Sequence, residues 1–357
     1  MPTFAHRGRP GRPIDPRRQR RLLQTDDGRM YAIFEAKGKQ WRAEEGATIK
    51  LPSLDADPGD QVWVAEGVYK PSSSGVRDKS FAIPPEVAVY GGFEGTEAHR
   101  SDRDAKQYKT TLSGDIGTPS DKTDNSYHVV EASNHSVLDG FTVTAGYANS
   151  GTPNNKGAGI YMKGSQPVTV RKCVFTNNEA NSYGGAAYIE NSVPTFKKCL
   201  FVNNSANSSG GAVYNGSDAK PEFQNTIFAQ NTSVDKGGAI YAEVNCLTTV
   251  TNCVFYNNSA TNGGAFALSD GCAPLIKNSI LWNNSAGTDG AELYAEDGSG
   301  SACTPEFYYS NVQGGVNGSR LVTSGTSSVT DGTGNINATP LFQDAATPLG
   351  PDNTFRT

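Results

Sequence analysis

The sequence predicts an all-β fold, a parallel β-solenoid (β-helix) in which each coil takes up about 26–27 positions of the sequence. A glycine-rich block occurs six times, and its last residues are 161, 188, 214, 241, 267 and 294, so the steps are 27, 26, 27, 26 and 27. A Phe-x-x-Asn motif keeps the same period, and short β-branched and aromatic runs lie between the turns. A repeat this regular indicates one structural unit stacked on copies of itself.

The glycine-rich blocks combine a Gly-Gly pair, or a close variant, with an aliphatic residue and usually a tyrosine. They occupy residues 157–161, 184–188, 210–214, 237–241, 263–267 and 290–294. The glycines fit a corner that is either too tight for a Cβ or in need of a positive φ. We therefore expect them to shape the coil.

The residues between the blocks favour strands over helices. Glycine pairs, Asn, Ser and β-branched residues are poor in helix interiors, and the last of these are good strand formers. The leucine spacing of a leucine-rich repeat and the glycine-rich nonapeptide of calcium-binding β-rolls are both absent from the sequence. Short strands are predicted at 169–170, 173–175 and 187–189, with several strands per coil.

Stacked coils lie about 4.8 Å apart, so equivalent side chains land on one another. The phenylalanines are then predicted to form an internal aromatic column, and the asparagines an amide ladder at a corner. Asparagine also tolerates left-handed backbone angles. The predicted members are Phe175, Phe201, Phe228, Phe255, Asn178, Asn204, Asn231, Asn258 and Asn284.

The repeated Gly-Gly-Ala-Ile and Phe-x-x-Asn pattern resembles the repeats of chlamydial polymorphic outer membrane proteins. It is similar, more broadly, to right-handed parallel β-helix proteins of bacterial surfaces in the pectin-lyase-like superfamily. Segments 58–69, 89–97, 112–116 and 138–142 resemble the first coils of such proteins, and 334–342 resembles the closing segment of choice-of-anchor proteins. The resemblance implies a right-handed coil and a secreted or cell-surface location, and it leaves activity open.

The sequence predicts a single β-helix over residues 46–357. Within it, 46–156 form irregular first coils with a long loop at 95–127, 157–300 the regular repeats, and 301–357 irregular terminal coils that look truncated. Residues 1–45 are basic and rich in Arg and Pro, and we expect either a disordered extension or a wrongly set start.

The charge of the chain is uneven. Residues 1–45 contain 11 Lys/Arg against 6 Asp/Glu, which leaves 20 against 30 in the rest of a chain whose net charge is −5. An acidic body argues against nucleic acid as a partner. No segment is apolar and long enough to span a membrane. We expect a monomer whose partner is a polysaccharide or another cell-surface glycan.

Cysteine spacing predicts one disulfide. Cys246 and Cys272 are one coil apart, and each follows the end of its glycine-rich block by five residues. Stacking brings their Cα atoms near the separation that a disulfide needs. Cys303 shares a Cys-x-Pro motif with Cys272, so Cys272–Cys303 is the alternative pair. Either disulfide suits an extracytoplasmic location.

Two outward columns in the repeats contain charged residues. Arg171, Lys172, Lys197 and Lys198 form a basic patch that either receives uronate carboxylates or is a solvated, solubilising edge. A second column contains Glu190 and Glu243 on alternate coils, about 9.6 Å apart. This separation is at the outer limit for an inverting glycosidase pair and too long for a retaining pair.

The long excursion at 99–128 is the other candidate, since long ordered loops are often functional. Its oxygen ligands Asp115, Asp124 and Asn125 suit Ca²⁺, and we expect no other cofactor. The excursion also contains candidates for catalysis of β-elimination, which needs a general base and groups that stabilise the developing negative charge. These are His128, Asp115, Arg100 and Arg103. The alternative is that these residues only form turns and hold the loop.

Two functions follow as hypotheses. The first is an extracytoplasmic bacterial β-helix acting as a surface structural or adhesin-like module that binds glycans. The second is a polysaccharide lyase or glycoside hydrolase that acts on an acidic polysaccharide at the excursion. The unbroken repeat and the lack of a convergent catalytic set favour the first.

Overall fold

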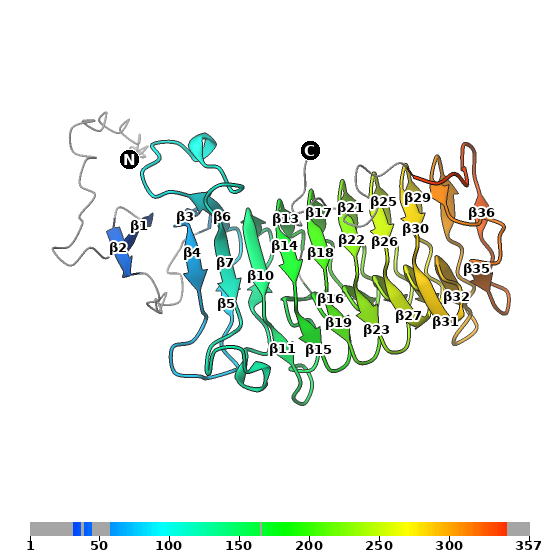
Figure 1. The fold of residues 1–357 in the computed structure, drawn as a ribbon, viewed down its shortest axis with the longest axis horizontal. Coiled ribbons are helices and arrows are strands. Elements are labelled where there is room, and N and C mark those ends of the chain that lie inside the picture. Colours follow the sequence, from blue (N-terminus) through cyan, green and yellow to red (C-terminus); the bar gives the residue numbers. More distant parts are fainter. Residues whose placement is uncertain (1–30, 37–38, 45–57, 165, 341–357) are drawn as a thin grey trace, which may run out of the picture.

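The computed structural model describes residues 58–164 and 166–340, and the backbone strands β1 (Tyr31–Ala36) and β2 (Lys39–Glu44). These two strands pair antiparallel as a hairpin. Apart from this hairpin, the predicted basic extension at 1–45 lies outside the described residues. From β3 onward the chain winds into an elongated shaft (Figure 1), so the predicted all-β solenoid is confirmed.

Four parallel sheets run along the shaft, and we number them in the order in which a coil passes through them. Sheet 1 contains β3 (Gln61–Ala65), β6 (Ala88–Phe93), β9 (Val137–Asp139), β13 (Thr169–Arg171), β17 (Thr195–Lys197), β21 (Glu222–Gln224), β25 (Thr249–Thr251), β29 (Leu275–Lys277), β33 (Glu306–Tyr308) and β36 (Thr330–Asp331). Sheet 2 contains β4 (Gly67–Tyr69), β7 (Thr110–Ser113), β10 (Phe141–Thr144), β14 (Val174–Thr176), β18 (Leu200–Val202), β22 (Ile227–Ala229), β26 (Val254–Tyr256), β30 (Ile280–Trp282) and β34 (Asn311–Val312).

The remaining two sheets complete each coil. Sheet 3 contains β11 (Tyr147–Ala148), β15 (Glu179–Ala180), β19 (Ser205–Ala206), β23 (Thr232–Ser233), β27 (Ser259–Asn262) and β31 (Ser285–Asp289). Sheet 4 contains β5 (Phe81–Ile83), β8 (Val130–Ala132), β12 (Ile160–Lys163), β16 (Ala187–Glu190), β20 (Val213–Gly216), β24 (Ile240–Glu243), β28 (Phe266–Ser269), β32 (Leu293–Glu296) and β35 (Leu321–Thr323). Two short 3-10 helices, η2 (Arg100–Asp102) and η3 (Lys122–Asp124), lie in the excursion.

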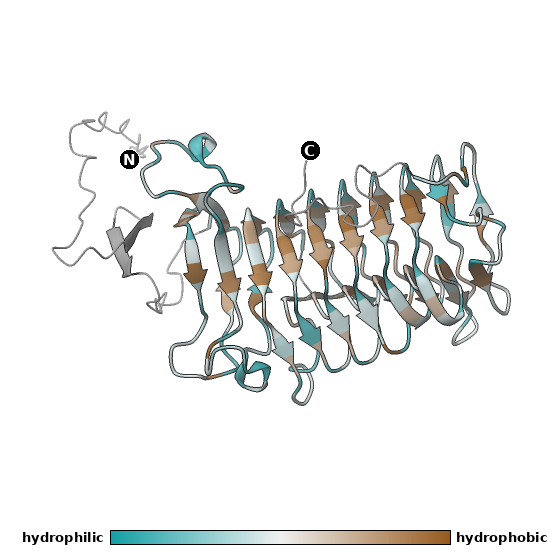
Figure 2. Ribbon diagram, viewed as in Figure 1, coloured by the Kyte–Doolittle hydropathy of each residue, from teal (hydrophilic) through white to brown (hydrophobic). Residues whose placement is uncertain are grey.

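The core is a stack of phenylalanine rings inside sheet 2. Phe175, Phe201, Phe228 and Phe255 are paired in register on neighbouring strands and have no exposed surface. Their ring centroids are 4.9, 4.9 and 4.7 Å apart and the rings are nearly parallel. Apolar residues therefore recur from strand to strand along the shaft (Figure 2), as expected for a core that grows by adding coils.

The asparagine column forms a hydrogen-bonded ladder at the corner between sheets 2 and 3. Each Nδ2 donates to the Oδ1 of the next asparagine and to a backbone carbonyl of the preceding coil, as Asn231 does with Asn258 (2.9 Å) and Phe201 (2.9 Å). The left-handed residue of this corner is the one before each ladder asparagine, such as Asn177 with φ 53°. The ladder side chains are thus needed for their hydrogen bonds, not for their backbone angles.

The two glycines of each block have different roles. The first has a positive φ, which is 67° at Gly237. The second passes close to the next coil, and a Cβ on Gly238 would lie 2.3 Å from the carbonyl oxygen of Gly264. Both reasons proposed from the sequence therefore apply, one to each glycine.

A buried glutamate ends the ladder. Glu292 occupies the block position that alanine occupies in most coils, and it has no exposed surface. It accepts a hydrogen bond from Asn284 Nδ2 (2.5 Å) and pairs with Arg320, whose Nη2 lies 2.8 Å from Oε1. The last ladder amide thus donates to a carboxylate that an arginine neutralises.

The predicted Cys246–Cys272 disulfide is absent, because all six cysteines are free and buried. The thiol of Cys272 instead forms hydrogen bonds with those of Cys246 and Cys303. Stacked residues with the same rotamer differ by a translation, which gives a Cβ–S–S–Cβ dihedral near zero, whereas a disulfide needs about 90°. Close Cα atoms in register are therefore not sufficient for a disulfide.

We expect the thiols of Cys173, Cys199 and Cys253 to resist alkylation in the native protein, because all three are buried. Burial raises the pKa of Cys173 and that of Cys253 to about 12, so little thiolate is present at neutral pH. Mass spectrometry after alkylation, without reductant, should show six labelled cysteines in the denatured protein and no label on these three in the native one. A Cys246–Cys272 or Cys272–Cys303 peptide pair would contradict this expectation.

Candidate functional site

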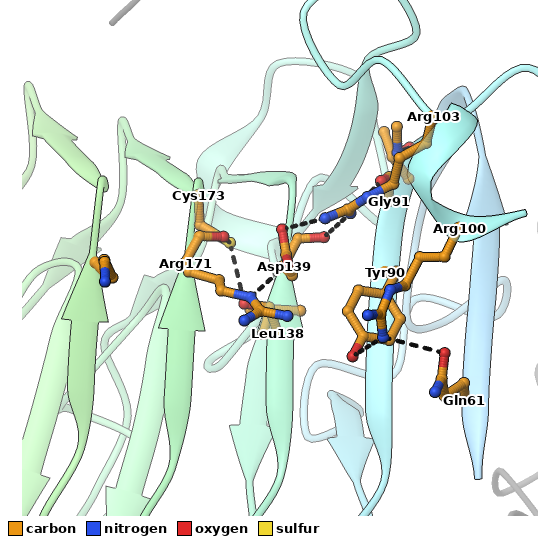
Figure 3. A network of polar contacts seen from close by, with 12 residues as sticks. Gln61, Tyr90, Gly91, Arg100, Arg103, Leu138, Asp139, Arg171 and Cys173 are labelled. Atoms are coloured by element: carbon orange, nitrogen blue, oxygen red, sulfur yellow. Dashed lines mark hydrogen bonds and ion pairs between the residues drawn. The ribbon is translucent and has the colours of Figure 1, made fainter. Parts of the chain in front are cut away.

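The outer face of sheet 1 contains a column of polar and aromatic side chains near the start of the shaft. Trp63, Tyr90, Asp139, Arg171 and Lys197 are paired in register on β3, β6, β9, β13 and β17. Strand side chains alternate between the two faces, so the flanking residues are buried in the core while this column faces outward. Figure 3 shows the centre of this column.

Asp139 is the anchor of the column. It is only 1% exposed, and two arginines approach its carboxylate from different parts of the chain. Arg103 Nη2 lies 2.7 Å from Oδ1, and Arg171 Nε lies 2.5 Å from Oδ2 (Figure 3). Arg103 also donates to the carbonyl oxygen of Gly91 (2.8 Å). The buried carboxylate therefore fixes two guanidinium groups at the surface of the sheet.

Tyr90 lies beside Arg103 and Arg171 and also contacts a third arginine, Arg100. The guanidinium carbons of Arg100, Arg103 and Arg171 lie 4.6, 5.2 and 5.9 Å from its ring centroid. Arg100 also donates to the Tyr90 hydroxyl (2.8 Å) and remains exposed (Figure 3). Cation–π attraction holds the three positive charges together, against their mutual repulsion.

Exposed lysines extend this positive charge along the shaft. Lys197 follows Arg171 on the next strand, and Lys172 and Lys198 lie at the adjoining corner between sheets 1 and 2. We call the whole set the basic strip. It consists of Arg100, Arg103, Arg171, Lys172, Lys197 and Lys198.

The structure divides the predicted catalytic candidates between different surfaces. Arg100 and Arg103 return to sheet 1, whereas His128 is buried next to sheet 4, where its Nδ1 lies 3.1 Å from the carbonyl oxygen of Gly157. The ring of His128 packs against Tyr161 at 4.9 Å, and burial lowers its pKa. Asp115 lies 4.0 Å from Lys70. The proposed set of a base with two arginines is therefore not assembled.

The glutamate column lies on the outer face of sheet 4, in the predicted register. Glu190 and Glu243 are two strands apart, with Gly216 between them. Glu190 accepts hydrogen bonds from Tyr188 and Lys163, which hold its pKa below the usual value although burial acts to raise it. Glu243 accepts a 2.5 Å hydrogen bond from Tyr214.

The glutamates are therefore partners of a stacked tyrosine column rather than a matched acid and base. The rings of Tyr161, Tyr188 and Tyr214 are 5.3 and 5.0 Å apart, and burial raises the pKa of Tyr188. Glu190 therefore lacks the raised pKa that a general acid needs, and Glu243 is engaged with Tyr214.

Sequence analysis missed Tyr90 and Asp139 as site residues. Both lie within segments typical of first coils, and the whole excursion separates them along the chain although they are paired in register on β6 and β9. No repeat period therefore connects the two. An Asp-Gly pair after a buried strand was the available signal.

No helix of the described residues is long and apolar enough to cross a membrane.

Residues 129–332, more than half of the chain, match the family model described as a right handed beta helix region. The chain is also similar to the large ribosomal subunit protein bL21 of Protochlamydia amoebophila (strain UWE25), with 37% identity over 67 residues, which is 19% of this chain and 58% of that protein. For bL21 of Roseiflexus castenholzii (strain DSM 13941 / HLO8) the identity is 46% over 37 residues, or 10% of this chain and 31% of that protein. The matches thus span less than two thirds of these relatives, and no solved structure matches the chain.

Proposed function

Because this chain belongs to the right-handed β-helix family, we propose that it is a secreted or cell-surface protein that binds an acidic polysaccharide along the outer face of sheet 1. The shaft acts as an adhesin-like scaffold, and the basic strip is the binding surface. The ribosomal relatives share too short a segment with the chain to contribute to this proposal.

The observation that carries the proposal is the clustering of Arg100, Arg103 and Arg171 around Tyr90. Among the described residues the one carboxylate in an ion pair with these arginines is Asp139, which is buried, so net positive charge is left at the surface. Guanidinium groups bind carboxylates and sulfates in a planar, two-pronged manner. A chain of acidic sugars presents such groups repeatedly.

The backbone at the two corner lysines also supports a binding role. Lys172 and Lys198 have φ of 52° and 55°, an uncommon conformation for residues other than Gly, Asn and Asp. Asparagine occupies the same corner on the next three coils, at positions 225, 252 and 278. Lysine is therefore not the residue that the turn itself favours, which points to a use for its charge.

Binding without cleavage is the form of the proposal that the geometry favours. His128 is buried and engaged with Gly157, and Glu190 and Glu243 are engaged with tyrosines. None of these three side chains supplies a general acid or a general base beside the basic strip. The same experiment separates this proposal from a surface structural role without a ligand.

We expect Arg100→Ala to weaken binding of an acidic polysaccharide about tenfold, the equivalent of losing one charge-assisted hydrogen bond. Calorimetry with polygalacturonate, alginate and chondroitin sulfate measures the affinity, with neutral amylose as the reference ligand. Binding should also weaken as salt is raised, because exposed charges are screened.

The matched control is Lys220→Ala, which removes an exposed charge at the turn before β21, outside the basic strip as defined. Equal losses in Arg100→Ala and Lys220→Ala, or equal binding of amylose, would contradict the proposal. Ultraviolet absorbance from unsaturated products would reveal a lyase instead.

A further inference from the structure

The excursion contains a closed loop, residues 114–126, which we call the 114–126 loop. Its ends are joined by a hydrogen bond from Ser126 N to the carbonyl oxygen of Gly114 (2.8 Å). Farther out, Asp124 Oδ2 accepts a hydrogen bond from Thr118 N (2.7 Å). The Asp124 carboxylate also lies directly over Gly117, where an added Cβ would be 2.3 Å from Oδ2. These contacts bring the limb after Gly114 against the limb before Ser126.

Four side-chain oxygens of this loop are shielded from solvent and have no hydrogen-bond partner. They are Asp115 Oδ1, Asp124 Oδ1, Asn125 Oδ1 and Ser126 Oγ. Asn125 is 6% exposed and Ser126 is fully buried. Buried polar atoms are nearly always paired, because an unpaired one costs about 1–3 kcal/mol. Four such atoms in one short loop indicate a missing partner that satisfies oxygen acceptors.

We propose that the 114–126 loop binds one Ca²⁺ ion. Two carboxylates, an amide oxygen and a hydroxyl are hard oxygen ligands of the kind that Ca²⁺ takes six to eight of, with water completing the shell. Among the described residues no three His, Cys, Asp or Glu side chains gather as a metal site, so the amide and hydroxyl oxygens and water would have to supply part of the shell. The site lies apart from the basic strip and does not depend on the proposed function.

The neighbouring charges leave room for a cation. Lys70 Nζ lies 4.0 Å from Asp115 Oδ2, and Arg77 Nε donates to the backbone oxygen of Asn125 (2.6 Å). Neither group forms a hydrogen bond with the four unpaired oxygens. Lys122 is directed away from the site, to Glu179 on the next coil (2.7 Å).

The ion would fix the excursion to the shaft. Gly114 N donates to the carbonyl oxygen of Thr144 and Tyr147 N to that of Ser126, both at 2.8 Å, so the loop is hydrogen bonded to the following coil. An ion that holds its two limbs together therefore stabilises the contact between the irregular first coils and the regular ones.

Thermal unfolding and calorimetry of the full chain test the proposal. We expect CaCl2 to raise the melting temperature relative to EDTA, with one site and a Kd of about 10⁻⁴–10⁻³ M, the range of extracellular calcium modules. Terbium should occupy the site as well, with emission sensitised by the adjacent Tyr127 and quenched by added calcium. MgCl2 should have a smaller effect, because Mg²⁺ gives up its water reluctantly.

The variants are Asp124→Asn and Asp115→Asn, with Asp78→Asn as the control on an exposed aspartate nearby. Each loop variant should weaken calcium binding at least about tenfold, the lower bound for losing even a supporting group of a metal site. In EDTA the same variants should melt close to the wild-type temperature, because asparagine keeps the size of aspartate and its Oδ1 can still accept a hydrogen bond such as that from Thr118 N to Asp124. The control should behave as wild type in both buffers.

Melting temperatures that are equal in CaCl2 and EDTA overturn the proposal, and so does a calcium affinity that both loop variants retain. An equal shift in MgCl2 overturns the assignment to calcium. Circular dichroism of each variant shows that it is folded. No polysaccharide is present, so these outcomes are independent of glycan binding.

Discussion

Replacing Phe228 by alanine should lower the free energy of unfolding by about 3–5 kcal/mol. Phe228 has no exposed surface and is stacked between Phe201 (4.9 Å) and Phe255 (4.7 Å). Its ring also meets the edge of Phe223 at 5.2 Å. Truncation would open a cavity in the middle of a column whose neighbours are held by their own strands and cannot collapse into it.

Lys198→Ala is the control for this prediction, because Lys198 is exposed at the corner of the same region. Its effect should stay below about 0.5 kcal/mol. Urea unfolding followed by circular dichroism measures both. Similar effects for the two variants would show that the phenylalanine column does not carry the stability of the shaft.

Replacing Asn231 by alanine should cost a comparable amount, about 3–5 kcal/mol, through hydrogen bonds rather than packing. Its Oδ1 accepts from the backbone N (3.1 Å) and Nδ2 (3.0 Å) of Asn204, while its Nδ2 donates to Phe201 and Asn258. All of these groups are buried. Alanine leaves them without a partner and without access to water.

Two further variants separate the ladder from a general preference for asparagine. Asn231→Asp keeps the size and the acceptor but cannot donate to Phe201, so it too should be strongly destabilised. Asn207→Ala removes a similar side-chain hydrogen bond, to Asn181 (2.9 Å), at an exposed position and should cost less than about 0.5 kcal/mol. Denaturant unfolding of all three decides the matter, and an Asn231→Ala protein as stable as Asn207→Ala would exclude a structural ladder.

The regular part of the fold was predictable because every coil repeats the same physical problem. Phe201 and Phe228 are paired in the register that the repeat period requires, and so are Glu190 and Glu243 through Gly216. A period gives the register directly, and strand alternation then gives the face.

The basic strip was only partly predictable, because its centre lies where the period fails. Arg171 and Lys197 are one coil apart, so the period alone predicts that they are neighbours. Tyr90 and Asp139 also lie on neighbouring strands, but the insertion that carries Arg100 and Arg103 separates them along the chain. No spacing rule predicts which sheet a long excursion folds back onto.

The cysteine column shows a different limit, because the period brings the sulfur atoms together but does not determine their dihedral angle.

The amide ladder has a direction, since every hydrogen bond between two of its side chains runs from Nδ2 to the Oδ1 of the following coil, and the last Nδ2 donates to Glu292. Hydrogen bonds aligned in one sense polarise each other, so a negative charge is a fitting terminus. Because each interior coil donates to the next in the same way, one coil can be duplicated or deleted without breaking the ladder. Each such change alters the length of the shaft by about 4.8 Å. The unit with Glu292 and its Arg320 partner is not interchangeable in this way, because it closes the series.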